Sequence, residues 1–167
     1  MPGDALPDEP LSLEFDPSPA AETRATLAHE INDFNSRAFA YAPTRFAFLS
    51  RDGSGTLLAG VMGTISWGWL FVEAVWVGDA LRGRGVGRAL MAAAERHARM
   101  AGCHSVWLDT FQARDFYLRL GYDAFGVLDN YPHGQQRTFM RKALGPAPET
   151  GGGPGSGPAA NGPEDGT

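Results

Sequence analysis

A glycine-rich loop between an apolar strand and a helix constrains this chain more than any other feature. Residues 75–90 read VWVGDALRGRGVGRAL, in which a strand is expected to end at Val77 and an alanine-rich helix follows the last glycine. The first N–H groups of a helix have no intrahelical partner, and the helix dipole makes that end partly positive. Glycines let a ligand approach the backbone, and the interleaved arginines donate charge-assisted hydrogen bonds. The segment therefore predicts a phosphate site at the start of the helix.

The spacing of the glycines excludes two common phosphate motifs. A P-loop requires a lysine followed by serine or threonine after its second glycine, and no such pair follows here. The dinucleotide fingerprint G-x-G-x-x-G also fails, because its last position falls on an arginine or a leucine. The pattern that fits is R-x-x-G-x-G, at Arg82, Gly85 and Gly87.

A second motif follows one helix and one strand downstream. Residues 107–122 read WLDTFQARDFYLRLGY, with Tyr117 shortly before Gly121-Tyr122. Together the two motifs resemble those of the GCN5-related N-acetyltransferase (GNAT) superfamily, in particular its bacterial branch acting on small molecules or peptides. The run FGVLDNYPHGQQRTFMRK resembles the last strands of one such branch. The resemblance covers most of residues 11–144.

The order of elements is that of an α/β fold, and the resemblance implies the GNAT fold. This fold has a central mixed, mostly antiparallel sheet of six to seven strands flanked by about four helices, and its parallel fourth and fifth strands splay apart. The apolar patterns predict strands over residues 11–15, 45–51, 56–66, 69–77, 105–109, 122–128 and 137–144. They predict helices over residues 20–39, 86–101 and 112–120.

The helix over residues 86–101 follows the phosphate loop and joins the two parallel strands. A right-handed crossover is expected for such a connection. Spacing along the helix predicts that one face is buried, with Val86, Leu90, Ala93, His97 and Met100. The opposite face is then formed by Arg88, Glu95 and Arg99.

The resemblance implies acetyl-CoA as a cosubstrate and no metal. The amides of the loop would hold the pyrophosphate, and the pantetheine arm would pair with the backbone of residues 75–77. An amine would attack the thioester directly, with a backbone N–H near Val75 stabilising the oxyanion. The implied cofactor contacts are Val75, Val77, Arg82, Gly83, Arg84, Gly85, Val86, Gly87, Arg88, Thr110 and Ala113. This chain departs from many members in having Thr110 where they have asparagine.

Two side chains are candidates for proton transfer. Tyr117 is placed by the second motif to protonate the leaving thiolate, although a tyrosine on a helix can equally be a packed aromatic. Glu73 is a carboxylate within an apolar strand, and period-two alternation puts it on the face of Val75 and Val77. Burial in this strand would raise the pKa of Glu73 and suit it to accept a proton from the ammonium. The alternatives are that Glu73 anchors the substrate or pairs with an arginine.

These features predict an N-acetyltransferase acting on a primary amine of a small molecule or peptide. The alternative is a non-catalytic module that binds acyl-CoA. We expect the acceptor pocket to form from the first helical segment, the strand around Glu73 and the loop over residues 131–133. Aromatic and acidic side chains from these regions would suit a cationic amine: Phe39, Tyr41 and Tyr131 with Asp33, Glu73 and Asp129.

Charge and composition limit the other partners. Residues 17–145 hold all 14 Lys and Arg and 11 of the 19 acids, so this part is mildly basic although the whole chain carries −5. Nucleic acid would require a longer basic stripe with interleaved aromatics, so a small polyanion is the expected partner. No apolar run of about 18 residues predicts a membrane span, and no secretory signal is evident, which predicts a cytoplasmic protein. The oligomeric state is left open, and a homodimer is allowed.

Composition also sets the expected domain limits. Residues 1–10 are acidic and proline-rich, and residues 145–167 are rich in glycine and proline with no aliphatic side chain larger than alanine. Such segments cannot bury enough surface to offset their ordering entropy. We therefore expect a disordered leader over 1–10, one acetyltransferase domain over 11–144 and a disordered tail over 145–167.

Overall fold

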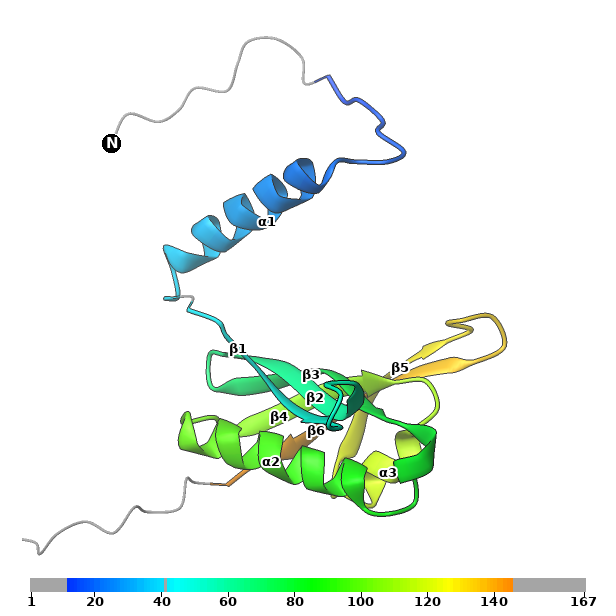
Figure 1. Cartoon of the computed structure of the whole chain (residues 1–167). Coiled ribbons are helices and arrows are strands. Elements are labelled where there is room, and N and C mark those ends of the chain that lie inside the picture. Colours follow the sequence, from blue (N-terminus) through cyan, green and yellow to red (C-terminus); the bar gives the residue numbers. More distant parts are fainter. Residues whose placement is uncertain (1–11, 41, 146–167) are drawn as a thin grey trace, which may run out of the picture. The chain divides into compact units, whose positions relative to one another are not determined.

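The computed structural model describes residues 12–40 and 42–145, and it divides the chain into two units, Met1–Tyr41 and Ala42–Thr167 (Figure 1). In the first unit the described residues form one helix, α1 (Ala21–Ser36), which confirms the predicted helix with an earlier end. The strand predicted over residues 11–15 is wrong for the described residues, since 12–16 carry no strand. A strand needs a neighbour for its N–H and C=O groups, and this unit offers none among the residues described.

The second unit is built on a six-stranded sheet. Its strands are β1 (Thr44–Arg51), β2 (Leu57–Ser66), β3 (Trp69–Val77), β4 (Ser105–Thr110), β5 (Asp123–Asp129) and β6 (Gln136–Ala143). They follow the order β1-β2-β3-β4-β6-β5, and every neighbouring pair is antiparallel except β3 and β4. This confirms the predicted α/β fold and its mostly antiparallel mixed sheet. The parallel pair is β3 and β4 and not the fourth and fifth strands, because residues 12–16 form no strand ahead of them.

The parallel strands separate soon after they meet. Pairing between β3 and β4 begins at Trp69 and Ser105 and ends at Phe71 and Trp107. Each strand continues beyond this point, to Val77 and Thr110. The facing edges of β3 and β4 therefore have no ladder partner across the gap, as the resemblance implied.

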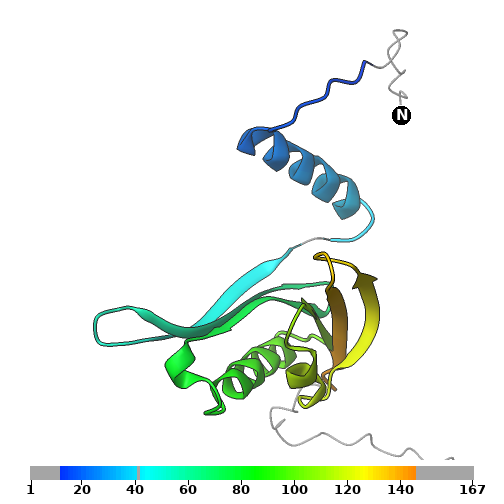
Figure 2. The ribbon, with the colours of Figure 1, turned by 90° about the vertical axis from the view of Figure 1, so that its right-hand side faces the viewer.

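The described part of the second unit also contains three helical segments. They are the 3-10 turn η1 (Asp79–Leu81), α2 (Val86–Met100) and the short helix α3 (Arg114–Leu118). Both α2 and α3 lie on the same side of the sheet (Figure 2). The core between them and the sheet includes Val61, Leu70, Val72, Met91, Ala94, Ala98, Val106, Leu108, Tyr117, Tyr122 and Met140. The glycine-rich loop over residues 78–85 thus joins two elements, β3 and α2, that are anchored in one core.

The buried face of α2 differs from the prediction. The buried residues are Met91, Ala94, Glu95 and Ala98, a stripe with i, i+3, i+4 and i+7 spacing. Met100, predicted to be buried, is 81% exposed. Small alanines let the helix approach the sheet closely, and Glu95 is tolerated because it is hydrogen-bonded there. Within the described ranges, no helix is long and apolar enough to cross a membrane.

Candidate active site

The loop between β3 and α2 has the geometry of an anion site. Gly83 and Gly85 have φ angles of 70° and 81°. This left-handed backbone conformation is unstrained for glycine and strained for a residue with a side chain. Gly85 is the residue before the first turn of α2, and its carbonyl accepts the N–H of Ala89 at 3.0 Å. The N–H groups of Val86, Gly87 and Arg88 precede that bond, so they have no acceptor in their own helix. They are available to hold an anion.

Gly87 fixes the packing around this turn. A Cβ atom placed on Gly87 would lie 3.2 Å from Cζ of Phe116 on α3 and 3.8 Å from Cγ2 of Val77 on β3. A side chain at this position would push the Phe116 ring away by a few tenths of an ångström, so glycine allows α2, α3 and β3 to meet this closely. The loop amides are therefore held at a fixed position relative to the parallel strands.

Arg82 stabilises the loop through contacts with residues just before it in the chain. Its Nε donates to the carbonyl of Val77 at 3.1 Å, and its guanidinium lies 2.8 Å from the carboxylate of Asp79. It thereby ties the loop back to the end of β3. Arg84 and Arg88 are exposed and take part in none of the ion pairs found among the described residues. Their charges are not already neutralised.

Two cavities of about 570 Å³ each meet at the separated strands. We call the first the loop cavity, lined by Val75, Val77, Leu81, Arg82, Gly83, Gly85, Val86, Gly87, Arg88, Ala113, Phe116, Tyr117 and Arg119. We call the second the splay cavity, lined by Val72, Glu73, Ala74, Val75, Leu108, Asp109, Thr110, Phe111, Gln112, Ala113, Tyr117, Pro132 and Gln135. Val75, Ala113 and Tyr117 line both, so a ligand extending from one cavity into the other passes these residues.

Tyr117 is buried at this junction. Tyr117 is 7% exposed, and its ring packs against the rings of Phe116 and Tyr122. Its ring centroid lies 5.0 Å from that of Phe116 and 5.7 Å from that of Tyr122. Burial raises the pKa of the Tyr117 phenol, and the carboxylate of Asp109 raises the pKa further. The phenol therefore keeps its proton through neutral pH, as a proton donor must.

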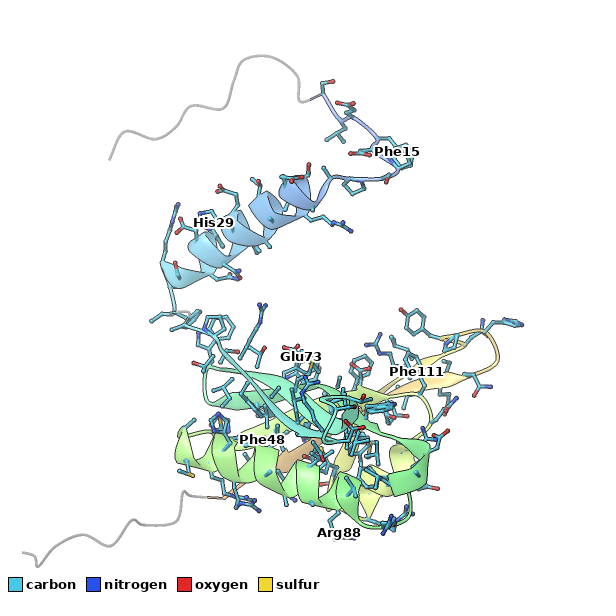
Figure 3. All side chains as sticks on the ribbon, in the orientation of Figure 1. Phe15, His29, Phe48, Glu73, Arg88 and Phe111 are labelled. Atoms are coloured by element: carbon cyan, nitrogen blue, oxygen red, sulfur yellow. The ribbon has the colours of Figure 1, made fainter. Side chains whose placement is uncertain are left out.

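Glu73 is not placed as predicted. In β2, Met62 pairs with Ala74 and Gly63 pairs with Val72, so Glu73 is the extra residue of a β-bulge. The bulge breaks the alternation, and Glu73 is exposed on the side of the sheet away from α2 (Figure 3). Its carboxylate accepts a hydrogen bond from the hydroxyl of Thr64. The predicted burial beside Val75 and Val77 is therefore wrong, although Glu73 does line the splay cavity.

A glycine marks this bulge in the sequence. A Cβ atom on Gly63 would lie 2.5 Å from the carbonyl oxygen of Phe71, so no other residue fits opposite Glu73. A glycine inside a strand is typical of a bulge or of a close backbone approach. Gly63 was the signal that period-two alternation fails along β3.

Asp109, which lines the splay cavity, belongs to an ion pair that the sequence did not predict. Arg137 on β6 donates through Nε to Asp109 on β4 at 2.7 Å, and both side chains are partly buried. The guanidinium also lies 5.3 to 5.6 Å from the ring centroids of Phe111, Tyr131 and Phe139. Asp109 raises the pKa of Arg137, mainly through this hydrogen bond. The pair fixes Asp109 near Tyr117.

The cofactor residues named from the sequence gather as a group, with one exception. Nine of them line the loop cavity, and Thr110 lines the splay cavity, where its Oγ1 accepts the N–H of Ala113 at 3.0 Å. Arg84 lines neither cavity. The residue that the prediction missed is Arg119, which lies just after α3 and lines the loop cavity.

The residues expected around the acceptor are only partly brought together. Pro132 and Gln135 of the loop after β5 line the splay cavity, whereas Tyr131 contacts Arg137 and Asp129 accepts a hydrogen bond from Gln136 at 2.7 Å. Tyr41 lies outside the described residues. Asp33 and Phe39 belong to the first unit, and their contribution to an acceptor pocket stays a prediction.

Comparison with known proteins identifies acetyltransferases as relatives of this chain. The family model described as acetyltransferase (GNAT) family matches residues 9–122. A blasticidin-S acetyltransferase of Streptomyces morookaense is 41% identical over 93 residues, or 54% of this chain and 68% of that protein. An acetyltransferase of Agrobacterium fabrum is 30% identical over 125 residues, or 73% of this chain and 91% of that protein. A crystal structure of a candidate acetyltransferase from Agrobacterium tumefaciens superposes with a TM-score of 0.76 at 26% identity, covering 80% of this chain and 99% of that one.

Proposed function

Because this chain belongs to the GNAT family of acetyltransferases, we propose that it transfers the acetyl group of acetyl-CoA directly to a primary amine of a small molecule. The observation that carries the proposal is the junction of the two cavities at Tyr117. One cavity contains the phosphate loop, and the other contains carboxylates suited to an amine. The acetyl thioester belongs between them.

The loop cavity suits the cofactor. The amides of residues 86–88 bind the diphosphate of coenzyme A, and the neighbouring arginine side chains neutralise part of its charge. The pantetheine arm then follows β3 toward Val75, where the separated strands offer unpaired backbone groups. This route leads the thioester to the residues shared by both cavities, Val75, Ala113 and Tyr117.

The chemistry needs few groups. The bound ammonium first releases one proton to water, and the neutral amine nitrogen then attacks the thioester carbonyl carbon. A backbone N–H near Val75 stabilises the resulting oxyanion. The carbon–sulfur bond then breaks, and the Tyr117 hydroxyl gives its proton to the leaving thiolate. The proton lost by the attacking nitrogen restores the phenol. The products are the N-acetylated amine and free coenzyme A.

The splay cavity suits a cationic acceptor. Glu73 and Asp109 both line it, and Asp109 already pairs with Arg137. The exposed Glu73 carboxylate is therefore the group that attracts and orients the ammonium, an anchoring role. Its exposure removes the burial on which the general-base interpretation depended. The name of the Streptomyces relative, a blasticidin-S acetyltransferase, supports a small molecule over a peptide as acceptor.

An amine panel tests this proposal. Purified full-length protein is incubated with acetyl-CoA and with aminoglycosides, polyamines, blasticidin S, amino acids or peptides, and release of the free thiol is measured. We expect amine-dependent release with a small cationic acceptor. Turnover only with anionic amino acids would contradict the cationic pocket. Tight acetyl-CoA binding with no amine-dependent release from any acceptor would favour a non-catalytic acyl-CoA-binding module instead.

A further inference from the structure

A third cavity adjoins the splay cavity at the turn between β5 and β6. It has a volume of about 510 Å³, and its lining includes Phe111, Arg114, Asn130, Gln135, Gln136 and Thr138. We call it the hairpin cavity, because most of these residues belong to the β5–β6 hairpin and its turn. Phe111 and Gln135 line the splay cavity as well, so a molecule seated in the splay cavity can extend past these two residues into the hairpin cavity.

The two cavities differ in charge. Glu73 and Asp109 line the splay cavity, whereas Arg114 is the only charged residue among the described residues that line the hairpin cavity. The Arg114 guanidinium lies 3.8 Å from the carboxylate of Asp115, and both side chains are exposed. A pair of this kind contributes little, so the guanidinium retains donors for a ligand. The hairpin cavity therefore favours an anionic group.

The neutral groups of the hairpin cavity add hydrogen-bond donors. Asn130 accepts the N–H of Gly134 through its Oδ1 at 2.8 Å, and its amide NH2 group has no partner among the described residues. Thr138 is 4% exposed, and its hydroxyl makes no hydrogen bond in the described part of the chain. Since no fully buried polar side-chain atom there lacks a partner, this hydroxyl is open to the cavity. A guanidinium with neutral donors beside it suits a carboxylate, which only accepts hydrogen bonds.

The turn that carries part of this lining is held by its own backbone. The N–H of Tyr131 donates to the carbonyl of Gln135 at 3.1 Å, and the N–H of Gln135 donates to the carbonyl of Pro132 at 2.8 Å. The Tyr131 ring also lies near that of Phe111, with centroids 6.1 Å apart, where the hairpin meets the loop after β4 (Figure 3). The wall of the cavity therefore needs little reorganisation to bind a ligand.

The charges of the two adjoining cavities define a class of acceptor. We propose that the acceptor is a small amino acid whose primary amine and carboxylate lie at opposite ends of the molecule. Its amine enters the splay cavity, where the exposed Glu73 attracts the ammonium. Its carboxylate enters the hairpin cavity, where Arg114 is the principal contact.

This acceptor class rests on the proposed function, since it assumes that the amine reacts in the splay cavity. Polyamines and aminoglycosides are then poor acceptors, because neither carries an anion for Arg114. The α-amino group of an amino acid is a poor acceptor for another reason. That nitrogen and its carboxylate share one carbon atom, so they cannot reach separate cavities.

Unbranched ω-amino acids and their carboxamides test the assignment. The series runs from β-alanine to 6-aminohexanoate, and each amide matches its acid in length and ammonium charge. At one or more chain lengths we expect kcat/KM to be about tenfold higher for the acid than for its amide, as one charge-assisted contact would give. Arg114→Gln should reduce this ratio to about twofold or less. Arg114→Lys should recover part of the ratio, because it restores the charge without the planar donors.

Arg96→Gln is the matched control, because Arg96 is an exposed arginine on α2 that lines none of the three cavities. It should keep the wild-type ratio. Weaker binding of acetyl-CoA by Arg114→Gln in calorimetry would overturn the assignment, by placing Arg114 on the cofactor. A high ratio retained in Arg114→Gln would overturn it too, since the carboxylate would then be bound elsewhere.

The remaining outcomes separate the acceptor class from the proposed function. A ratio near one at every chain length would overturn the acceptor class and leave the proposed function intact. Thiol release with other amines of the panel but with no member of the series would have the same meaning. No amine-dependent release with any acceptor would refute the proposed function, and the acceptor class with it.

Discussion

Replacing Glu95 by glutamine should lower the free energy of unfolding by about 2–3 kcal/mol. Glu95 is 5% exposed and accepts hydrogen bonds from Tyr122 Oη at 3.0 Å and from Lys142 Nζ. Glutamine keeps the shape of the side chain but removes its charge, so the ammonium of Lys142 loses its ionic partner. Arg99, 3.6 Å from the same carboxylate, loses part of its partner as well.

The expected magnitude follows from burial. Removing one member of a fully buried ion pair costs about 3–5 kcal/mol. The Lys142 side chain is 23% exposed, so water solvates part of the uncompensated charge and the cost is smaller. Glu95 lies on α2 and contacts Lys142 on β6. Loss of this ion pair should therefore weaken the packing of α2, the helix that follows the glycine-rich loop.

Urea unfolding followed by circular dichroism measures the effect. The midpoint should fall by about 1–2 M with an unchanged slope. Glu73→Gln is the matched control, because it makes the same chemical change at an exposed position and should alter stability by less than about 0.5 kcal/mol. A double-mutant cycle with Lys142→Gln should give a coupling energy of about 1–2 kcal/mol. A loss below about 1 kcal/mol for Glu95→Gln, or no coupling, would refute this reasoning.

Three further changes test the candidate active site. Tyr117→Phe should lower kcat about 100-fold with the dissociation constant of acetyl-CoA nearly unchanged, and an unaltered kcat would exclude the phenol as the acid. Gly87→Glu should abolish acetyl-CoA binding in calorimetry, because the side chain meets Phe116 and repels the diphosphate; retained affinity in a folded variant would contradict the assignment of the loop. Asp109→Asn should lower the pKa of Tyr117, because it removes a carboxylate that raises this pKa and leaves Arg137 unpaired. Phenolate absorbance, corrected with Tyr117→Phe, should then appear at lower pH than in the wild-type protein; a shift to higher pH would reverse the assigned sign.

Asp109 and Arg137 show which parts of the site a single sequence leaves undetermined. They lie 28 positions apart and meet because β6 pairs directly with β4. The chain order suggested only that two last strands follow the second motif. Their insertion as β4-β6-β5 depends on which edges pair in the folded sheet. No local pattern around either residue reveals this ion pair.

Glu73 and Glu95 show a second way in which prediction from the sequence failed. Both were assigned a face by extending one period along an element, and both assignments failed. A bulge opposite Gly63 moved Glu73 to the open side of the sheet. Hydrogen bonds from Tyr122, just before β5, and from Lys142 on β6 allowed Glu95 to be buried. Periodicity averages over an element, so a single inserted residue or a distant countercharge overrides it.

The sequence by itself determined the glycine-rich turn between β3 and α2, the strands and helices of the second unit, and the family. These follow from glycine conformations, apolar spacing and helix ends, which depend on residues only a few positions apart. The tertiary structure alone decided where the strands separate, which carboxylates line the cavities and that Arg119 lines the same cavity as Arg88. Those features depend on strand register and on contacts between residues far apart in the chain, which local chemistry does not specify.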